Sequence, residues 1–197
     1  TRIKLGLITL TLSDPAVFLI RNELASQIEP LLSGGTGSVS HTEEVPSFLP
    51  DRFEPGTPNI PGILGLHAAL CDLEQTDMGK LHQHELELTQ YFINGLMQMD
   101  PSESTLRAIG KHNTIERTSV VSVQTLQTDM ARVAYEMDDT YGIMTRVGLH
   151  CAPSAHKTLG TYPEGTIRFS FGPENTHHEV DLALHALAEI TGSPYHL

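Results

Sequence analysis

The sequence predicts an α/β fold, in which strands and helices alternate along the chain and pack in layers. Two patterns support this prediction. Apolar residues recur at helical spacing over 62–74 and 80–99, and they alternate with polar residues over 166–171, as in a half-buried strand. With 197 residues, 39% of them hydrophobic, the chain is long and apolar enough to bury a sizeable core.

Residues 1–60 are expected to hold only short regular elements. Apolar, β-branched segments over 3–12 and 16–21 predict short strands, and 22–32 predicts a helical turn or a loop. The stretch over 33–61 is irregular and rich in glycine and proline. A loop of this length in a compact domain is usually functional or disordered.

Regular elements follow one another closely after this loop. Pro61 suits the first turn of the helix predicted over 62–74, and Asp100-Pro101 ends the helix predicted over 80–99. Capping residues and apolar spacing define the other elements. These are strands over 106–109, 118–123, 141–147 and 166–171, a helix from the Thr128-Asp129 cap to Met137, and a helix over 179–190 capped by Asn175-Thr176.

The charge balance excludes several classes of partner. Lys and Arg number 12 against 24 Asp and Glu, so the formal net charge is −12, and neither nucleic acid nor an anionic membrane is an expected partner. Two cysteines favour a reducing, cytoplasmic environment. No apolar run is long enough to span a bilayer, and the start at Thr1 instead of Met suggests a longer parent protein or a partial gene model.

Cys151 is the leading candidate for chemistry. It lies in the segment 146–153, where Gly148 and Pro153 predict a loop. The same segment contributes Arg146 and His150, and positive charge from such side chains favours the reactive thiolate. The alternative is that Cys151 is a small buried residue, and the sequence leaves both interpretations open.

Other polar residues are weaker candidates. Arg168 is predicted to point away from its neighbours Ile167 and Phe169, where it can bind a carboxylate through two parallel hydrogen bonds. An ordinary surface arginine shows the same pattern. Cys71 falls on an apolar helix face and is expected in the core. The 11 histidines show no metal-ligand spacing, so no metal is predicted. The glycines over 34–38 either hold an anion or form a plain turn.

Four motifs occur in order along the chain. They are Phe53-Glu54-Pro55-Gly56-Thr57-Pro58-Asn59, the segment from Arg146 to Pro153, Gly165-Thr166-Ile167-Arg168-Phe169-Ser170, and Asn175-Thr176 followed by Glu179-Val180-Asp181. From about Phe18 to the C-terminus, the sequence resembles the C-terminal half of class V aminotransferases, specifically the cysteine desulfurase and selenocysteine lyase-like enzymes. The resemblance implies a homodimeric pyridoxal 5'-phosphate (PLP) enzyme of fold type I.

The resemblance also implies a division of the chain and a reaction. Residues 1–60 correspond to a remnant of the large PLP domain with an active-site loop, 61–99 to connecting helices, and 100–197 to the C-terminal α/β small domain. The implied substrate is L-cysteine or a selenocysteine-like amino acid. Sulfur leaves L-cysteine, L-alanine is released, and a sulfur-acceptor protein is a further implied partner.

Matching positions give four residues a role within this resemblance. Cys151 corresponds to the cysteine that receives sulfur as a persulfide, and Arg168 to the arginine that binds the substrate α-carboxylate. Arg146 corresponds to a supporting arginine on the loop of Cys151. Thr57 corresponds to the threonine that reaches the PLP phosphate of the other subunit. A thiolate suits sulfur transfer through an S–S bond, and PLP supplies an electron sink.

The N-terminal segment departs from the family pattern. Lys4 lies near the position of the PLP lysine but lacks the preceding His and the following Gly-Pro turn, and the residues that contact the PLP ring would precede Thr1. Two alternatives therefore stand: a truncated, non-catalytic class V fold, or another class V enzyme such as an epimerase or a lyase. The Arg-x-Gly-x-His-Cys setting favours the desulfurase over other class V enzymes. We expect the complete protein to be active and this chain alone to bind no PLP.

Overall fold

The computed structural model describes residues 17, 19–39 and 41–194. The chain divides into two compact units, with the boundary between Gln75 and Thr76. The strand predicted over 3–12, and with it Lys4, lies outside the described residues. No helix among the described residues combines the length and hydropathy needed to cross a bilayer.

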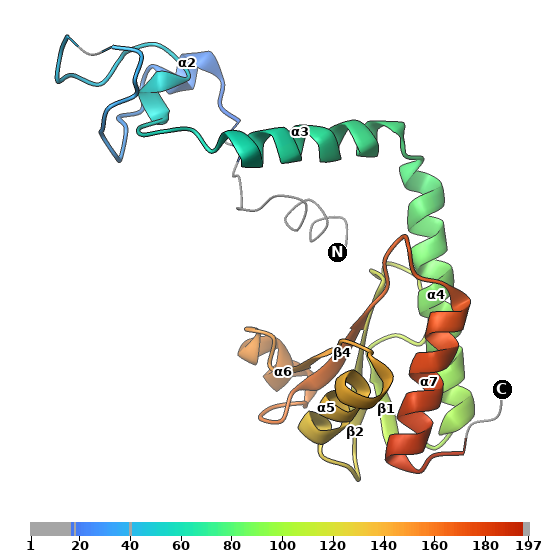
Figure 1. Ribbon diagram of the computed structural model, residues 1–197. Helices are drawn as coiled ribbons and strands as arrows, with labels where there is room; N and C mark the ends of the chain where they lie inside the picture. Colours follow the sequence, from blue (N-terminus) through green and yellow to red (C-terminus); the bar gives the residue numbers. More distant parts are fainter. Residues whose placement is uncertain (1–16, 18, 40, 195–197) are drawn as a thin grey trace. The chain divides into compact units, whose positions relative to one another are not determined.

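The unit before Thr76 consists of two short helical segments in long loops, followed by a longer helix (Figure 1). Its elements are α2 (Asn22–Ala25), the 3-10 helix η1 (Asp51–Phe53) and α3 (Ile60–Gln75). Two hydrogen bonds link distant loops: the Arg52 guanidinium donates to the Ile28 carbonyl (3.0 Å), and the Gly56 N–H donates to the Gly35 carbonyl (2.8 Å). The second bond holds the glycine-rich loop against the segment that contains Thr57.

The prediction of a strand over 16–21 is wrong for the described residues of this segment. Val17 and residues 19–21 are irregular, and the Leu19 side chain is 90% exposed. A strand needs a neighbour to pair its N–H and C=O groups. Among the described residues of this unit no strand is assigned, so the apolar segment has no sheet to join there.

The helix predicted over 62–74 is confirmed as α3, which spans Ile60–Gln75. The Asn59 side chain accepts a hydrogen bond from the Gly62 N–H (3.0 Å) and closes the first turn. The apolar face of the helix is not covered within this unit, because only Gly62 and Ala69 are buried and Leu64 remains 62% exposed. Apolar spacing therefore predicted the helix correctly but not its packing.

The unit from Thr76 onward is built on a four-stranded antiparallel sheet with strand order β1-β2-β4-β3 (Figure 1). Its strands are β1 (Leu106–Ile109), β2 (Val120–Thr125), β3 (Arg146–Gly148) and β4 (Thr166–Ser170). Its helices are α4 (Met78–Met99), α5 (Met130–Tyr141), α6 (Pro153–Leu159) and α7 (His177–Thr191). The predicted alternation of strands and helices is confirmed in this unit.

Side-chain caps define where three of these helices begin. Asp77 accepts from the N–H groups of Gly79 and Lys80 (both 3.1 Å) at the start of α4. Asp129 accepts from the Arg132 N–H (2.8 Å) at the start of α5. Thr176 and Glu179 form a reciprocal capping box at the start of α7. The three predicted helices are therefore confirmed, with boundaries set by local side-chain chemistry.

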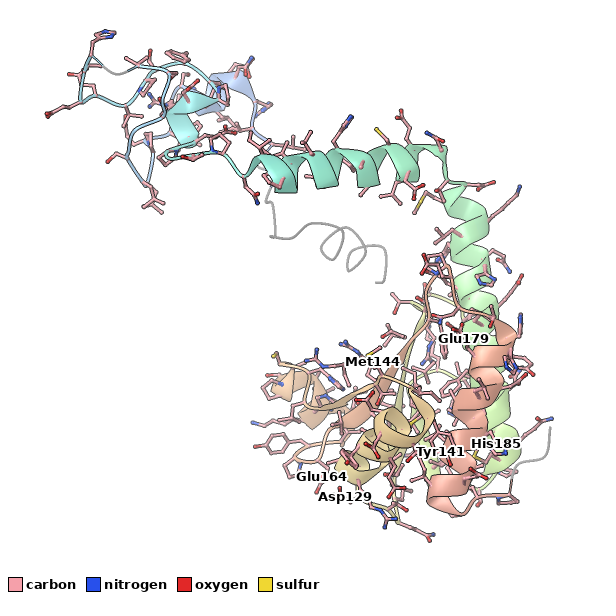
Figure 2. All side chains as sticks on the ribbon, in the orientation of Figure 1. Asp129, Tyr141, Met144, Glu164, Glu179 and His185 are labelled. Carbon is pink, nitrogen blue, oxygen red and sulfur yellow. The ribbon has the colours of Figure 1, made fainter. Side chains whose placement is uncertain are left out.

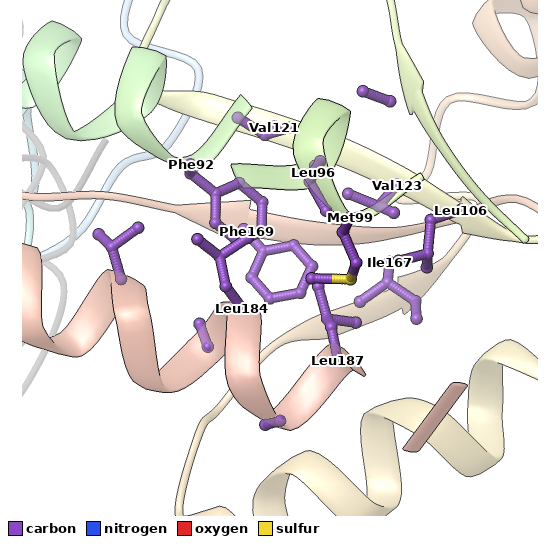
Figure 3. Close-up of a cluster of buried hydrophobic side chains, with 14 of the residues drawn as sticks. Phe92, Leu96, Met99, Leu106, Val121, Val123, Ile167, Phe169, Leu184 and Leu187 are labelled. Carbon is purple, nitrogen blue, oxygen red and sulfur yellow. The ribbon is translucent and has the colours of Figure 1, made fainter. Parts of the chain in front are cut away.

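The core lies between one face of the sheet and helices α4, α5 and α7 (Figure 3). The Phe92 ring centroid lies 4.7 Å from that of Phe169 and 5.3 Å from that of Phe171. Gly95 allows α4 and α7 to pack closely, because a Cβ atom there would stand 2.3 Å from Leu184 Cδ1. The sheet thus has one buried apolar face and one polar face.

Two elements between α5 and β4 differ from the prediction. The strand predicted over 141–147 is shorter, because α5 continues to Tyr141 and ends at Gly142 with a φ of +66°. Helix α6 was not predicted at all. Two residues in the sequence indicate this helix: Pro153 lies in its first turn, and Gly160 ends it in the left-handed conformation, with a φ of +68°.

Polar side chains join α5 and α7 at the surface of this unit. The Tyr141 hydroxyl donates to the Glu189 carboxylate, and His185 Nδ1 lies 3.8 Å from the same carboxylate; Figure 2 labels Tyr141 and His185. The hydrogen bond to Glu189 raises the pKa of Tyr141 above its usual value. The loop after α5 has less cover, since Met144, also labelled in Figure 2, is 86% exposed.

Asp100 fixes the turn between α4 and β1. Its carboxylate accepts hydrogen bonds from the backbone N–H groups of Thr105 (2.6 Å) and Leu106 (3.0 Å) and from the Ser102 hydroxyl (2.8 Å). Burial by itself would raise the pKa of Asp100, but the bonds from Leu106, Thr105 and Ser102 lower it well below the usual value. The folded state therefore favours the ionised carboxylate.

We expect Asp100→Asn to lower the free energy of unfolding by about 1–3 kcal/mol at pH 7, because an amide is uncharged and has one acceptor oxygen, so it cannot accept both from the two backbone N–H groups at Oδ2 and from the Ser102 hydroxyl at Oδ1. Because the folded pKa is depressed, the ionised side chain stabilises the protein above the unfolded pKa of about 4. That contribution is lost as the pH falls further, so the difference between the two proteins should shrink in acid. Urea denaturation at several pH values measures it. Asp139→Asn, on the exposed surface of α5, is the control and should change little.

Candidate active site

The pairing of β3 with β4 brings two predicted site residues together. Arg146 lies opposite Arg168 in the register of this pair, and Ser122 of β2 lies opposite Arg168 on the other side. Residues directly opposite in antiparallel strands share a face of the sheet. The neighbours of Arg168, Ile167 and Phe169, are buried in the core, so both arginines belong to the polar face, as the sequence predicted for Arg168.

Arg168 has unused hydrogen-bonding capacity. Its side chain is half-buried, and its Nε atom is buried without a hydrogen-bond partner among the described residues. Leaving such a donor unpaired costs free energy. A carboxylate approaching the polar face would satisfy it with the fork geometry that guanidinium groups prefer.

Cys151 lies in the turn that joins β3 to α6. The turn closes with a hydrogen bond from the Ala152 N–H to the Leu149 carbonyl (2.8 Å). The cysteine is a free thiol and is exposed, so the loop placement is confirmed and the interpretation as a small buried residue is wrong. His150 and Cys151 have φ values of +49° and +58°, which non-glycine residues adopt infrequently.

Cys71 does not lie in the core, contrary to the prediction. It is half-exposed on α3, where its Sγ atom lies 3.7 Å from His67 Nδ1. The reason is that the described residues of its unit leave much of the apolar face of this helix uncovered. The two thiols of the chain thus belong to different units, and only Cys151 lies in the unit of the paired arginines.

His150 reaches from the turn to β4. Its Nε2 atom lies 3.1 Å from the Thr166 carbonyl and 3.3 Å from the Thr166 hydroxyl. Burial and then the positive charge of Arg168 lower the pKa of His150, and these effects outweigh the bond to Thr166. The imidazole is therefore neutral at pH 7. The sequence prediction that a histidine supplies positive charge here is therefore wrong for His150.

The base of the turn is held by a close approach of two glycines. Gly165 has a φ of +80°, and a Cβ atom there would lie 2.3 Å from the carbonyl group of Gly148. No other residue fits both the backbone conformation and the available space. Gly165 also accepts a hydrogen bond through its carbonyl from Gln124 Nε2 (3.3 Å), and the Gln124 amide oxygen accepts from Arg107.

Sequence reasoning missed the roles of Thr166 and Gln124. The signal for Thr166 was present, because residues two apart on a strand share a face and Arg168 was already assigned to the polar one. Gln124 could not be found in this way, since its contact with Gly165 depends on strand order. His156 was also missed: it is buried, and its Nδ1 atom lies 2.6 Å from the Thr161 hydroxyl.

Thr57 belongs to the other unit and is exposed. It follows Gly56, whose φ is +92° and whose N–H donates to Gly35. Gly34 and Gly35 line a surface pocket that also contains the acidic residues Glu43 and Glu44, which disfavour an anion in that pocket. Among residues 17, 19–39 and 41–194, no three His, Cys, Asp or Glu side chains lie close enough to hold a metal ion.

Comparison with known proteins finds relatives that carry one recurring name. A probable cysteine desulfurase 2 of Mycobacterium leprae is 34% identical over 167 residues, covering 84% of this chain and 38% of the relative. A probable cysteine desulfurase of Pyrococcus abyssi is 33% identical over 180 residues, covering 90% and 43%. The chain thus spans about two-fifths of the length of the curated relatives it matches.

Solved structures show the same likeness. The apo structure of a cysteine desulfurase from Thermococcus onnurineus NA1 matches with a TM-score of 0.72 at 33% identity, covering 88% of this chain and 42% of that one. The cysteine desulfurase CsdA from Escherichia coli matches with a TM-score of 0.65 at 26% identity, covering 86% and 40%. These matches confirm the mixed α/β fold.

The likeness extends to a whole protein family. The sequence profile described as aminotransferase class-V matches residues 16–183, more than half of the chain. This range includes Thr57, Arg146, Cys151 and Arg168, the four residues to which the resemblance gave roles. The resemblance recognised from the ordered motifs is therefore confirmed, and the chain belongs to the aminotransferase class-V family.

Proposed function

We propose that the complete protein is a PLP-dependent cysteine desulfurase, which moves sulfur from L-cysteine onto Cys151 as a persulfide and releases L-alanine. One observation carries the proposal. An exposed thiol lies on the turn that leaves β3, the strand in which Arg146 pairs with Arg168, in a chain whose relatives are named cysteine desulfurases. A thiol that must meet a substrate needs this exposure, and an amino acid substrate needs a nearby cation.

The two arginines have separate parts in the proposal. Arg168 binds the substrate α-carboxylate, using a guanidinium whose Nε–H is buried and unpaired among the described residues. Arg146, exposed on the edge strand β3, adds a second positive charge on the same face. Together they hold the substrate so that its sulfur meets the Cys151 turn.

Cys151 performs the sulfur transfer in this proposal. Its thiolate attacks the sulfur of L-cysteine, an S–S bond forms, and the bond between that sulfur and the substrate Cβ breaks. The electron pair of the broken bond stays with the substrate carbon, which takes up a proton to give alanine. The Cys151 sulfur is oxidised to a persulfide and the substrate carbon is reduced, so no external redox partner is needed.

Thr57 is the described residue that fits a contact to PLP. Its hydroxyl is exposed on a loop tied to Gly35 through Gly56, which suits the proposed contact with a phosphate held by another subunit. When bound, PLP supplies an electron sink for bonds to the substrate α-carbon. Lys4 lies outside the described residues, so the attachment of the cofactor to this chain is not part of the proposal.

The remaining assignments complete the proposal. The complete protein acts in the cytoplasm as a homodimer, and a sulfur-acceptor protein takes the persulfide sulfur. Residues 1–60 are the end of the large domain with its active-site loop, 61–99 connect the domains, and 100–197 form the small domain. One compact unit holds the antiparallel sheet, Arg168 on β4 and Cys151 on the turn after β3, which supports placing 100–197 in one domain; α4 packs in the same unit.

The test is to supply L-cysteine to the complete protein without a reductant and to measure alanine and bound sulfur together. We expect one persulfide per subunit in the first turnover, and the peptide containing Cys151 should gain the mass of one sulfur atom. Selenocysteine, supplied separately, measures the preference between the two amino acids. Alanine formed while Cys151 stays unmodified would contradict the proposal.

A further inference from the structure

The turn that contains Cys151 needs a restraint beyond its own backbone. His150 and Cys151 are consecutive non-glycine residues in the left-handed region. Each such residue is disfavoured relative to the right-handed conformation, and the arrangement persists only where surrounding contacts hold it. The hydrogen bond from the Ala152 N–H to the Leu149 carbonyl closes the turn from within. Further contacts that hold the two residues at positive φ must come from residues outside the turn.

The His150 side chain provides an outside contact. It crosses from the turn to β4, where Nε2 lies 3.1 Å from the Thr166 carbonyl. A carbonyl oxygen can only accept, so Nε2 must carry the proton and donate. The neutral imidazole therefore has one orientation and one tautomer that satisfy this bond. Thr166 is 1% exposed, so water does not compete for its carbonyl from outside.

The acceptor is itself fixed to the sheet. Thr166 begins β4, directly after Gly165, whose carbonyl accepts from Gln124 on β2. Gln124 in turn accepts from Arg107 on β1. The close approach of Gly165 to Gly148 joins the same point to β3. The His150 contact thus ties the turn to a framework that includes all four strands.

We propose that His150 is the positioning residue of the Cys151 thiol: its Nε2–H bond to the Thr166 carbonyl holds residues 150 and 151 in the left-handed conformation that presents the sulfur. The inference rests on the proposed function in one respect: the proposed function explains why the Cys151 sulfur must be held in this position. The bond and its effect on the turn belong to the fold and can be tested without turnover.

The first test compares His150→Leu with His150→Gln in the complete protein. Gln keeps an N–H donor near the position of Nε2, and Leu does not, while neither residue favours a positive φ. Hydrogen exchange of the Ala152 amide, which closes the turn, is the measurement. We expect exchange roughly tenfold faster in His150→Leu and within about threefold of the wild type in His150→Gln.

Internal controls separate a local effect from unfolding. The amide of Val121, a fully buried residue of β2, should exchange at the same rate in all proteins, and His82→Leu on the exposed surface of α4 should change neither amide. If His150→Leu destabilises the whole protein, His150→Phe, which keeps an aromatic ring but has no N–H donor, replaces it. An unchanged Ala152 rate in the variant without the donor, or equal acceleration in His150→Gln, would overturn the inference.

The second test links the anchor to the proposed reaction. Because Arg168 is intact, His150→Leu should lower kcat for sulfur release roughly tenfold while KM for L-cysteine stays unchanged, and His150→Gln should restore most of kcat. A change in KM alone would overturn the positioning role. If the wild-type protein releases no sulfur from cysteine, the proposed function fails, whereas the exchange result still decides whether His150 anchors the turn.

Discussion

Cys151→Ala in the complete protein is expected to abolish sulfur release, a loss on the order of 10³-fold or more, while PLP remains bound. The variant lacks the atom that receives the sulfur, but it retains Thr57 and the two arginines. Alanine and sulfide production from L-cysteine and the visible absorbance of bound PLP are measured on the same sample. Retained alanine and sulfide production would show that the assignment of Cys151 is wrong.

Cys71→Ala is the matched control for this experiment. Both thiols lie outside the core, but Cys71 sits on α3 beside His67 in the other unit. We expect Cys71→Ala to retain wild-type activity. An equal loss in both variants would indicate a general requirement for thiols, such as protection from oxidation, and would contradict a specific role for Cys151.

Arg168→Ala is expected to weaken the productive binding of L-cysteine by about 2–5 kcal/mol, which corresponds to roughly a 30-fold to 5,000-fold loss in kcat/KM. The substrate carboxylate would lose its charged partner on the half-buried polar face. Steady-state kinetics with L-cysteine measure the loss. Unchanged KM and kcat would contradict the assignment.

Arg168→Lys refines this result. A lysine keeps the charge but lacks the planar fork, so we expect only partial recovery relative to Arg168→Ala. Arg132→Ala serves as the control, because Arg132 lies outside the four motifs and forms an exposed ion pair with Glu136 on α5. Such a pair contributes little to stability, and the substitution should leave the kinetics unchanged.

The parts of the fold that the sequence predicted well are those with local signals. Helices α4, α5 and α7 are capped by Asp77, Asp129 and Thr176, whose side chains accept hydrogen bonds from backbone N–H groups of the first turn. Each of these helices also has an apolar face that packs in the core. Strand β1 was predicted with its exact bounds because its ends coincide with changes in polarity. Caps and apolar spacing act within a few residues, so they can be read without knowing the tertiary structure.

The parts that failed depend on distant partners. The segment over 16–21 has strand-like composition, but the described residues of its unit offer no strand to pair with. The burial of α3 could not be predicted either, because helical spacing does not say which surface will cover the helix. Helix α6 is short, and its apolar pattern is too brief to recognise without its terminal Pro153 and Gly160.

The candidate site shows the same division. Gly148 and Pro153 indicated the loop of Cys151, and strand alternation placed Arg168 on the polar face, as the structure confirms. The neutral state of His150 could not be predicted, because it arises from burial and from Arg168, which is 18 positions away (168 − 150) in the sequence. Motifs therefore singled out the candidate residues, whereas strand pairing determined which arginines lie opposite each other, and burial determined the charge of His150.

The glycine contact at the base of the turn sets how far the thiol can travel. With Gly148 held against Gly165 and Pro153 beginning α6, residues 149–152 form a short segment between two fixed points, which the proposed bond of His150 to Thr166 restrains further. Cys151 is two residues from Pro153, and an extended chain advances about 3.5 Å per residue, so the backbone tether allows excursions of about 7 Å from that end. Under the proposed function, a sulfur atom on Cys151 cannot be transferred over a long distance, so the proposed acceptor must come to the turn.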